Sequence, residues 1–430
     1  MSSHMESAGG ASATATGYSW KNIALCSGIW CFGVAVLFIQ ISTSSFLATK
    51  LVGRTLSTIP VGVFLISTAI GTTVVPSLIS RFGGRAAYVS MYFAAALGCM
   101  LSTLGIYYLD DAPEQAFACV VLGCVPPGMA FAITNNVRFA VANFVPPAAA
   151  AKAVSYVVFG AIFAAVLGPE LAKYVRYWLD VEFAGSYLLA LIYHLILMSL
   201  AFAIDWPPPA GPPQGKVRSV REMFGSLPFV YSVGMQVLTF SSMAGLMVAS
   251  PVAMQHNGIS FISSTTAIQG HLLGMFAPAP LTPLIVGSVG EVTTVLLGLM
   301  VMTGGAAMNF AGDKIFASYV SSLLFVGIGW SWAYVASTGL TLKQIQPQEK
   351  FKMMAINDCA IFTMVAVCMA SAGSYFVGVG SNWYYFTATY ISFLGLGLLA
   401  TLFAMATGLM SPPAPPGVDT GGGAARDLEA

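Results

Sequence analysis

Charged residues are scarce in this chain. Asp, Glu, Lys and Arg together make up 8% of its 430 residues, whereas soluble proteins carry about 25%. A surface facing water on all sides cannot be built from so few charges. The formal net charge is only +1, so the basic excess that a nucleic-acid-binding face needs is also missing. We therefore expect a protein embedded in a lipid bilayer, with no nucleic-acid partner.

Motifs for catalysis and metal binding are also missing. The seven cysteines all fall in apolar stretches without the spacing of a zinc site, and we interpret them as free thiols packed like small hydrophobic side chains. No Gly-x-x-x-x-Gly-Lys-Ser/Thr loop occurs, so ATP hydrolysis is not the expected energy source. The first apolar run follows a Ser/Ala/Gly-rich tail and is too long for the core of a cleaved signal peptide. We expect no enzyme, no cofactor and no bound metal ion.

Long apolar runs are what the chain has in abundance, with hydrophobic residues at 57%. A membrane-spanning helix needs about 20 mostly apolar residues, and twelve stretches qualify. They lack alternation and are far longer than the roughly ten residues of a membrane β-strand. The sequence therefore predicts an all-α membrane protein with twelve transmembrane helices. The stretches are 21–45, 57–80, 85–108, 114–137, 150–174, 184–205, 226–249, 261–287, 291–311, 315–337, 352–376 and 382–408.

The chain divides at a polar stretch that begins at Trp206 and ends at Glu222. It contains five prolines and the cations Lys216, Arg218 and Arg221. Proline cannot donate a helical hydrogen bond, and clustered cations do not enter hydrocarbon, so this stretch is an aqueous linker. The predicted units are a disordered tail at 1–20, a six-helix bundle at 21–205, a cytoplasmic linker at 206–225, a second six-helix bundle at 226–410 and a disordered tail at 411–430.

Two further patterns describe orientation and symmetry. With the N-terminus placed in the cytoplasm, 12 of the 17 Lys and Arg residues fall in cytoplasmic segments and 5 outside. Because cytoplasmic loops are enriched in these residues, we expect both termini and the linker on that side. The loop after the second helix spaces Pro76 and Gly83 as the loop after the eighth spaces Pro283 and Gly290. The halves are therefore parallel pseudo-repeats, as in one large class of transporters.

One loop carries a resemblance to a known family. The loop after the second helix, with Arg81, Gly83 and Arg85, resembles the Gly-x-x-x-Asp-Arg-x-Gly-Arg signature of the major facilitator superfamily, although Pro76 and Ser80 stand where the first Gly and the Asp belong and Arg85 follows one position after the final Arg. Within that superfamily the chain resembles bacterial-type permeases of unassigned substrate. The resemblance implies a fold of two six-helix bundles that rock around a shared binding site at the membrane midplane.

Polar side chains at membrane depth need a reason, because burying them is costly. In the eighth helix His271 is either a proton carrier or substrate ligand, or a hydrogen bond between helices. The family resemblance places Trp330 on a cavity-lining helix, where its ring stacks on a ligand; the alternative is an anchor at the membrane interface. We predict that six residues face the space between the halves and bind substrate. They are Gln40, Gln236, Gln269, His271, Trp330 and Asn357.

Three charged residues are candidates for gating or proton coupling. Asp358 lies about two turns inside its helix, where a carboxylate must be paired, protonated or functional. The resemblance implies that Arg138 approaches it across the halves, so we predict a pair that closes the inner gate. The alternative is that Arg138 reaches the headgroups and Asp358 meets cytoplasmic water. Glu170, close to Lys173 in sequence, is either a proton site or part of an ion pair at the outer rim.

These observations predict a secondary active transporter that moves a small organic solute by alternating access. Protons are the candidate coupling ion, and the expected partners are a small-molecule substrate and the lipid bilayer, with the protein as a monomer. Two alternatives stay open. One is an exporter of amphiphilic compounds, and the other is a transporter-like receptor that binds a ligand without moving it.

Overall fold

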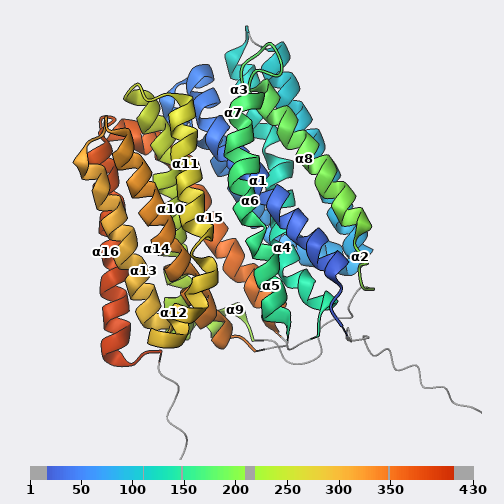
Figure 1. Ribbon diagram of the computed structural model, residues 1–430, viewed down its shortest axis with the longest axis vertical. Coiled ribbons are helices and arrows are strands. Elements are labelled where there is room, and N and C mark those ends of the chain that lie inside the picture. Colours follow the sequence, from blue (N-terminus) through green and yellow to red (C-terminus); the bar gives the residue numbers. More distant parts are fainter. Residues whose placement is uncertain (1–16, 110, 147–148, 209–217, 347–348, 411–430) are drawn as a thin grey trace, which may run out of the picture.

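The computed structural model describes residues 17–109, 111–146, 149–208, 218–346 and 349–410. Every regular element in these ranges is helical. The helices form two bundles that stand next to each other, one built from the chain before the linker and one from the chain after it (Figure 1). The linker positions 209–217 and the tail positions 1–16 and 411–430 lie outside the described residues.

The first bundle contains eight α-helical segments because several of its membrane spans are interrupted. Proline and glycine explain the breaks. Pro126 and Pro127 follow the junction at Cys124, and Pro169 lies in a π-helical turn over Val166–Glu170, since proline lacks the N–H that a regular helix needs. The segments are α1 (Trp20–Val52), α2 (Ile59–Tyr108), α3 (Pro113–Gly123), α4 (Val125–Ala140), α5 (Ala150–Phe159), α6 (Ala161–Ala165), α7 (Leu171–Val175) and α8 (Ala184–Ala203).

Helix α2 is two membrane spans joined at a kink. Its 50 residues would extend about 75 Å as one helix, more than twice the roughly 30 Å of a bilayer's hydrocarbon core. Gly83 breaks it, with a φ of 79° and a ψ of 163°, a backbone conformation that favours glycine. The loop expected between the second and third spans is therefore reduced to this kink.

The second bundle begins with a short helix and continues through longer ones. Ser219 starts α9 with a capping box, accepting from the Glu222 backbone N–H while the Glu222 side chain accepts from Ser219. The segments are α9 (Val220–Phe224), α10 (Leu227–His256), α11 (Phe261–Phe276), α12 (Thr282–Val289), α13 (Glu291–Ala307), α14 (Phe316–Lys343), α15 (Lys350–Gly378) and α16 (Trp383–Thr407).

Within the described ranges, length and hydropathy identify eleven segments able to cross a membrane, and the segment covering 54–108 holds two spans across the Gly83 kink. The all-helical architecture with twelve spans expected from the sequence is therefore confirmed. Successive spans run in opposite directions. We call the end where α8 finishes and α10 starts the linker end, at the bottom of Figure 1, and the opposite end the far end.

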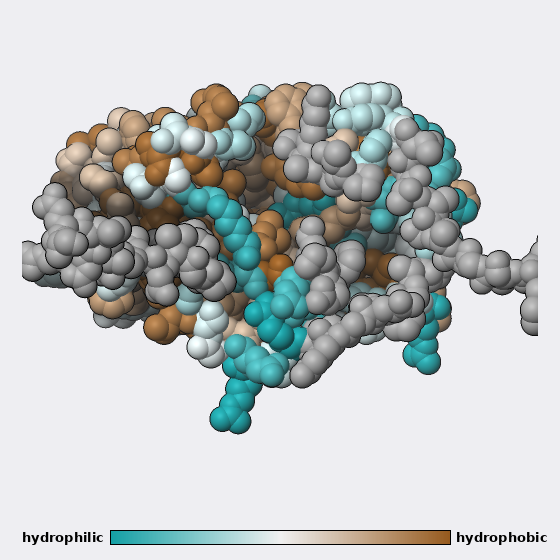
Figure 2. Space-filling model, turned by 90° about the horizontal axis from the view of Figure 1, so that it is seen from below, coloured by the Kyte–Doolittle hydropathy of each residue, from teal (hydrophilic) through white to brown (hydrophobic). Residues whose placement is uncertain are grey.

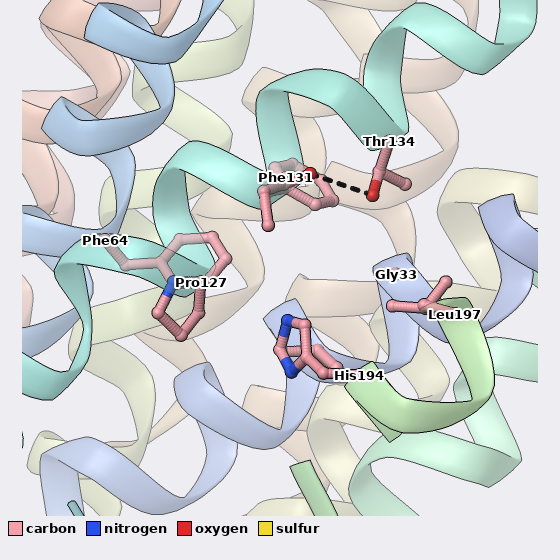
Figure 3. A pocket seen from close by; sticks show the side chains of 9 residues that line it. Gly33, Phe64, Pro127, Phe131, Thr134, His194 and Leu197 are labelled. Atoms are coloured by element: carbon pink, nitrogen blue, oxygen red, sulfur yellow. Dashed lines mark hydrogen bonds between the residues drawn. The ribbon is translucent and has the colours of Figure 1, made fainter. Parts of the chain in front are cut away.

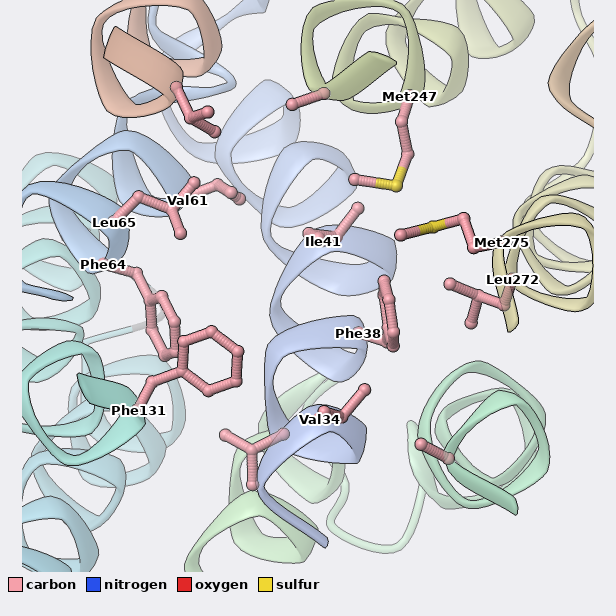
Figure 4. Packing of buried hydrophobic residues seen from close by; sticks show 14 of the residues in the cluster. Val34, Phe38, Ile41, Val61, Phe64, Leu65, Phe131, Met247, Leu272 and Met275 are labelled. Carbon is pink, nitrogen blue, oxygen red and sulfur yellow. The ribbon is translucent and has the colours of Figure 1, made fainter. Parts of the chain in front are cut away.

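Helix α1 lies between the two halves. Figure 4 shows it flanked on one side by Phe64 and Phe131 of its own bundle and on the other by Met247 and Met275 of the second bundle. On α1 itself, Phe38 is buried among these residues and meets Phe276 edge-on, with the ring centroids 6.5 Å apart. A continuous apolar core thus joins the bundles, and the site must be sought along this seam.

The end of the linker is attached to the second bundle. The Arg218 guanidinium binds the Glu349 carboxylate and donates to the Gln344 carbonyl oxygen at 2.7 Å. The Gln346 backbone N–H donates to the same carboxylate at 3.0 Å. These donors, with the hydrogen bond from Arg218 the largest influence, lower the pKa of Glu349 to about 2. The linker is thereby held against the start of α15.

Candidate functional site

The two halves are joined by hydrogen bonds at the far end. The Thr58 hydroxyl, between α1 and α2, donates to the Ala370 carbonyl oxygen at 3.1 Å and accepts from the Gly373 backbone N–H at 3.0 Å. Both partners belong to α15. Close by in the chain, the Arg54 guanidinium meets the His256 ring at the end of α10. The adjoining parts of α1 and α2 at the far end are therefore fastened to the second bundle.

A second group of far-end contacts centres on Lys173. Its ammonium donates to Glu170 at 2.5 Å and, across the seam, to Thr266 and Gln269 at 3.1 Å each. The Gln269 amide nitrogen in turn donates to the Ala165 carbonyl oxygen at 3.3 Å. The structure thus brings Glu170 and Gln269 together in one network that spans the halves. Glu170 has an ion-pair partner, as the rim alternative expected.

Toward the linker end the seam has a different character. The hydrogen bonds between the halves described above all lie in the part of the seam nearer the far end. Seen from the linker end, the surface has a recess near its middle, where apolar side chains show between hydrophilic ones (Figure 2). The halves are closed together at the far end in this conformation.

A polar cluster lies in the second bundle beside the seam. Gln236 is fully buried; its amide nitrogen donates to the Thr341 hydroxyl at 2.6 Å, and its amide oxygen accepts from the Thr338 hydroxyl at 3.1 Å. The amides of Gln236 and Asn357 exchange hydrogen bonds of 3.3 Å. Asn357 also donates to the Asp358 carboxylate at 3.4 Å. Two of the predicted binding residues and one predicted gating residue therefore form one chain of hydrogen bonds.

Arg138 faces this cluster from the first bundle. Its guanidinium donates to the Asn135 side-chain oxygen at 2.9 Å and lies over the Trp30 ring, 4.8 Å from the centroid. No ion pair within 4 Å joins Arg138 to Asp358 in the part of the chain that the structure describes. The two side chains are therefore not paired in this conformation.

Aromatic rings line the seam next to the polar cluster. Trp330 and Tyr334 on α14 are stacked with centroids 4.9 Å apart, and Phe240 of α10 meets each of them edge-on at 5.4 Å. Phe362 contacts Phe240 in its own half and Phe131 across the seam at 6.4 Å. The Trp330 indole N–H is buried without an acceptor among the described residues, although a buried indole usually finds one.

Two predicted binding residues point elsewhere in this conformation. The Gln40 amide oxygen accepts from the Ser44 hydroxyl at 2.8 Å, and that hydroxyl contacts Tyr187 of α8. Nδ1 of His271 lies 2.6 Å from the Leu323 carbonyl oxygen of α14. Each of these bonds stays inside one half, and Nε2 of His271 is buried without a hydrogen-bonding partner among the described residues. Whether Gln40 and His271 bind substrate stays a prediction.

A small space inside the first bundle is not a ligand site. Phe64, Pro127, Phe131 and His194 are among the residues that surround it, and it is too narrow to admit water (Figure 3). His194 is buried, with Nδ1 2.8 Å from the carbonyl oxygen of Ala190 one turn earlier. A structural role for this histidine agrees with the geometry.

Sequence reasoning missed three members of the site on α14. Tyr334, Thr338 and Thr341 take part in the aromatic and polar contacts just described. A signal for them existed. Trp330, Tyr334 and Thr338 are spaced four residues apart, and side chains at that spacing share one face of a helix. An amphipathic stripe in an otherwise apolar helix marks the face that is turned away from the lipid.

Comparisons with known proteins place the chain among transporters. No protein-family model matches the sequence. It is 28% identical over 359 residues to the riboflavin transporter RfnT of Brucella anthropi, an alignment that covers 82% of this chain and 88% of the relative. It is 23% identical over 362 residues to the uncharacterised MFS-type transporter YddS of Bacillus subtilis, with 80% and 81% coverage.

Solved structures show the same fold. The D-xylose-proton symporter superposes with a TM-score of 0.69 at 17% identity, covering 90% of this chain and 97% of that one. The partially occluded inward-open form of the xylose transporter XylE from E. coli gives a TM-score of 0.65 at 15% identity, with the same coverage. At sequence identities this low, the likeness to these two structures shows a shared fold and nothing more.

Proposed function

Since the chain belongs to the major facilitator superfamily, a family of transporters, we propose that it moves a small organic solute with a planar ring by alternating access around the seam between its halves. The main support for alternating access is the position of the contacts between the halves. They fasten the far end, while the aromatic and polar clusters lie along the same seam toward the linker end. Rocking the halves about this site would expose it to either side in turn.

The side chains at the site suit a ring with polar edges. Trp330 and Tyr334 offer aromatic faces on which a planar ring can stack. Gln236 and Asn357 offer both donors and acceptors, and the free indole N–H of Trp330 offers one more donor. Riboflavin, the solute named for the Brucella anthropi relative, has a planar ring with hydrogen-bonding edges. It is the first compound to test.

Asp358 and Arg138 are proposed to couple the cycle to protons and to close the linker end. Asp358 is buried, and Asn357 is its one hydrogen-bonding partner among the described residues. When the halves close at the linker end, Arg138 approaches from α4 and pairs with the carboxylate. A proton on Asp358 removes that attraction and lets the gate open. The ion pair contributes little net free energy, because both charges must be desolvated when they pair. A weak contact suits a gate that opens in every cycle.

The test measures binding and movement separately. Riboflavin should raise the unfolding temperature of the purified protein, because a ligand that binds only the folded state stabilises it. Trp330→Leu should weaken riboflavin binding about two- to tenfold, as expected for the loss of a stacking contact. Trp332→Leu is the matched control, because Trp332 lies on the same helix two residues away and therefore on another face. Equal losses of riboflavin binding in both variants would contradict a binding site at the seam.

A further inference from the structure

One far-end contact between the halves involves a histidine that faces solvent. His256 is the last residue of α10 and is exposed. Its Nδ1 contacts the guanidinium of Arg54, which begins a short 3-10 helix, Arg54–Leu56, in the other half. On its other side the imidazole meets the buried Phe376 ring edge-on, with the centroids 6.0 Å apart. The ring is thus held between an aromatic wall and a cation.

The chemistry of this contact fixes the protonation state of the histidine. A guanidinium carries only donors and stays charged at all relevant pH values. Nδ1 of His256 must therefore be the acceptor, which requires a neutral imidazole with its proton on Nε2. A protonated imidazole has no acceptor, and its positive charge would face that of Arg54. The Arg54–His256 contact exists only while His256 is neutral.

A second charged group gives the protonated ring another partner. Asp313, in the loop before α14, acts electrostatically on His256 with a sign opposite to that of Arg54. Its loop is attached to the residue next to His256, since the Asn257 amide donates to the Asp313 carbonyl oxygen at 2.9 Å. Asp313 and His256 belong to the same half. Adding a proton therefore exchanges an attraction between the halves for one within the second half.

We propose that His256 is a proton-binding site that holds the far end closed when it is neutral and releases it when it is protonated. Among the described residues, the other side chains that bridge the far end by hydrogen bonds are Thr58, Lys173, Thr266 and Gln269, and none of them is a histidine. Histidine is the side chain whose ordinary pKa, near 6.5, lies close to neutral pH. Acid on the far side thus favours the conformation open to that side. This inference rests on the alternating-access part of the proposed function and not on the substrate.

The test follows the distance between the halves as a function of pH. Spin labels at Gln115→Cys and Gly378→Cys, both exposed far-end positions in different halves, are introduced into a chain whose native cysteines have been replaced. Electron–electron distance measurements in lipid should show the long-distance population rising between pH 8 and pH 5.5. The expected change in the ratio of open to closed forms is about two- to fivefold, the range for an exposed charge contact.

Three variants distinguish this site from other titrating groups. His256→Gln keeps an acceptor but cannot bind the proton, so its distance distribution should change much less with pH than that of the wild type. Arg54→Gln removes the repelling charge and should reduce the response. Lys50→Gln is the control: Lys50 is also a far-end cation, but its partner Glu182 lies in the same half, so the response should persist. A wild-type protein without pH response, or a full response in His256→Gln, overturns the proposal. Because no substrate is present, either outcome is independent of whether riboflavin binds.

Discussion

Replacing Gly62 by alanine should push the protein out of the closed far-end conformation. Gly62 lies in α2 and approaches α15 of the other half. A Cβ atom there would sit 2.3 Å from the Ala370 Cβ, 2.7 Å from its Cα and 3.0 Å from its backbone nitrogen. Two of these three atoms are backbone, which cannot rotate away. The substituted chain relieves the clash by separating the halves where they now touch.

The size of the shift follows from the cost of overpacking. An added methyl group in a tightly packed site costs about 1–3 kcal/mol, and each 1.4 kcal/mol is a tenfold change in an equilibrium constant. The ratio of far-end-open to far-end-closed protein should therefore rise about five- to 150-fold in Gly62→Ala. The spin-label pair at positions 115 and 378 reports this ratio directly, and net transport should fall because one half of the cycle is disfavoured.

The matched control is Gly71→Ala in the same helix. Its added Cβ would meet the Ala132 Cβ at 2.7 Å and the Met129 carbonyl oxygen at 3.0 Å. Both partners belong to the first bundle, so this clash exists in every conformation. It should lower the unfolding temperature without changing the label distances. If Gly62→Ala instead behaves like Gly71→Ala, losing stability while its distances stay those of the wild type, the reasoning about the far-end seam is refuted.

Two further predictions concern the linker end. Glu349→Gln should lower the free energy of unfolding by about 1.5–3 kcal/mol at neutral pH, the range for hydrogen bonds to a charged group, because Arg218 loses its charged partner. Folding lowers the pKa of Glu349 to about 2, so the wild type should lose this stabilisation as the pH falls from about 4.5, the ordinary glutamate range, toward 2. Plots of unfolding temperature against pH for the two proteins should therefore converge in that window. Plots that stay parallel would contradict the prediction. Asp358→Asn should weaken transport and favour the form open at the linker end without lowering the unfolding temperature, and combining Arg138→Asp with Asp358→Arg should restore part of the activity; undiminished flux in Asp358→Asn would end the gating hypothesis.

The number and placement of the spans could be predicted from the sequence because the bilayer imposes length and hydropathy on each one. The helix breaks were partly readable too. The kink at Gly83 falls in the loop that resembled a family signature, and Pro169 interrupts the fifth span. Both residues act through the backbone, whose preferences are local. Local rules transfer directly from sequence to structure.

Side-chain direction could not be predicted in the same way. Most of these helices are apolar around their whole circumference, so periodicity does not show which face meets the other half. Gln269 donates a hydrogen bond to the other half. Gln40 and His271 looked equivalent to it in sequence, yet each bonds within its own bundle. Only the packing of neighbouring helices distinguishes these cases.

We propose that the solute crosses the membrane through the seam between the halves. Counterflow in proteoliposomes measures this passage, because exchange needs alternating access but no ion gradient. Vesicles loaded with unlabelled riboflavin should accumulate labelled riboflavin from outside when they contain the wild-type protein. Trp332→Leu should behave like the wild type, while Trp330→Leu should exchange more slowly. Binding of riboflavin without any exchange would instead identify a receptor, and exchange unaffected by Trp330→Leu would contradict the proposed path.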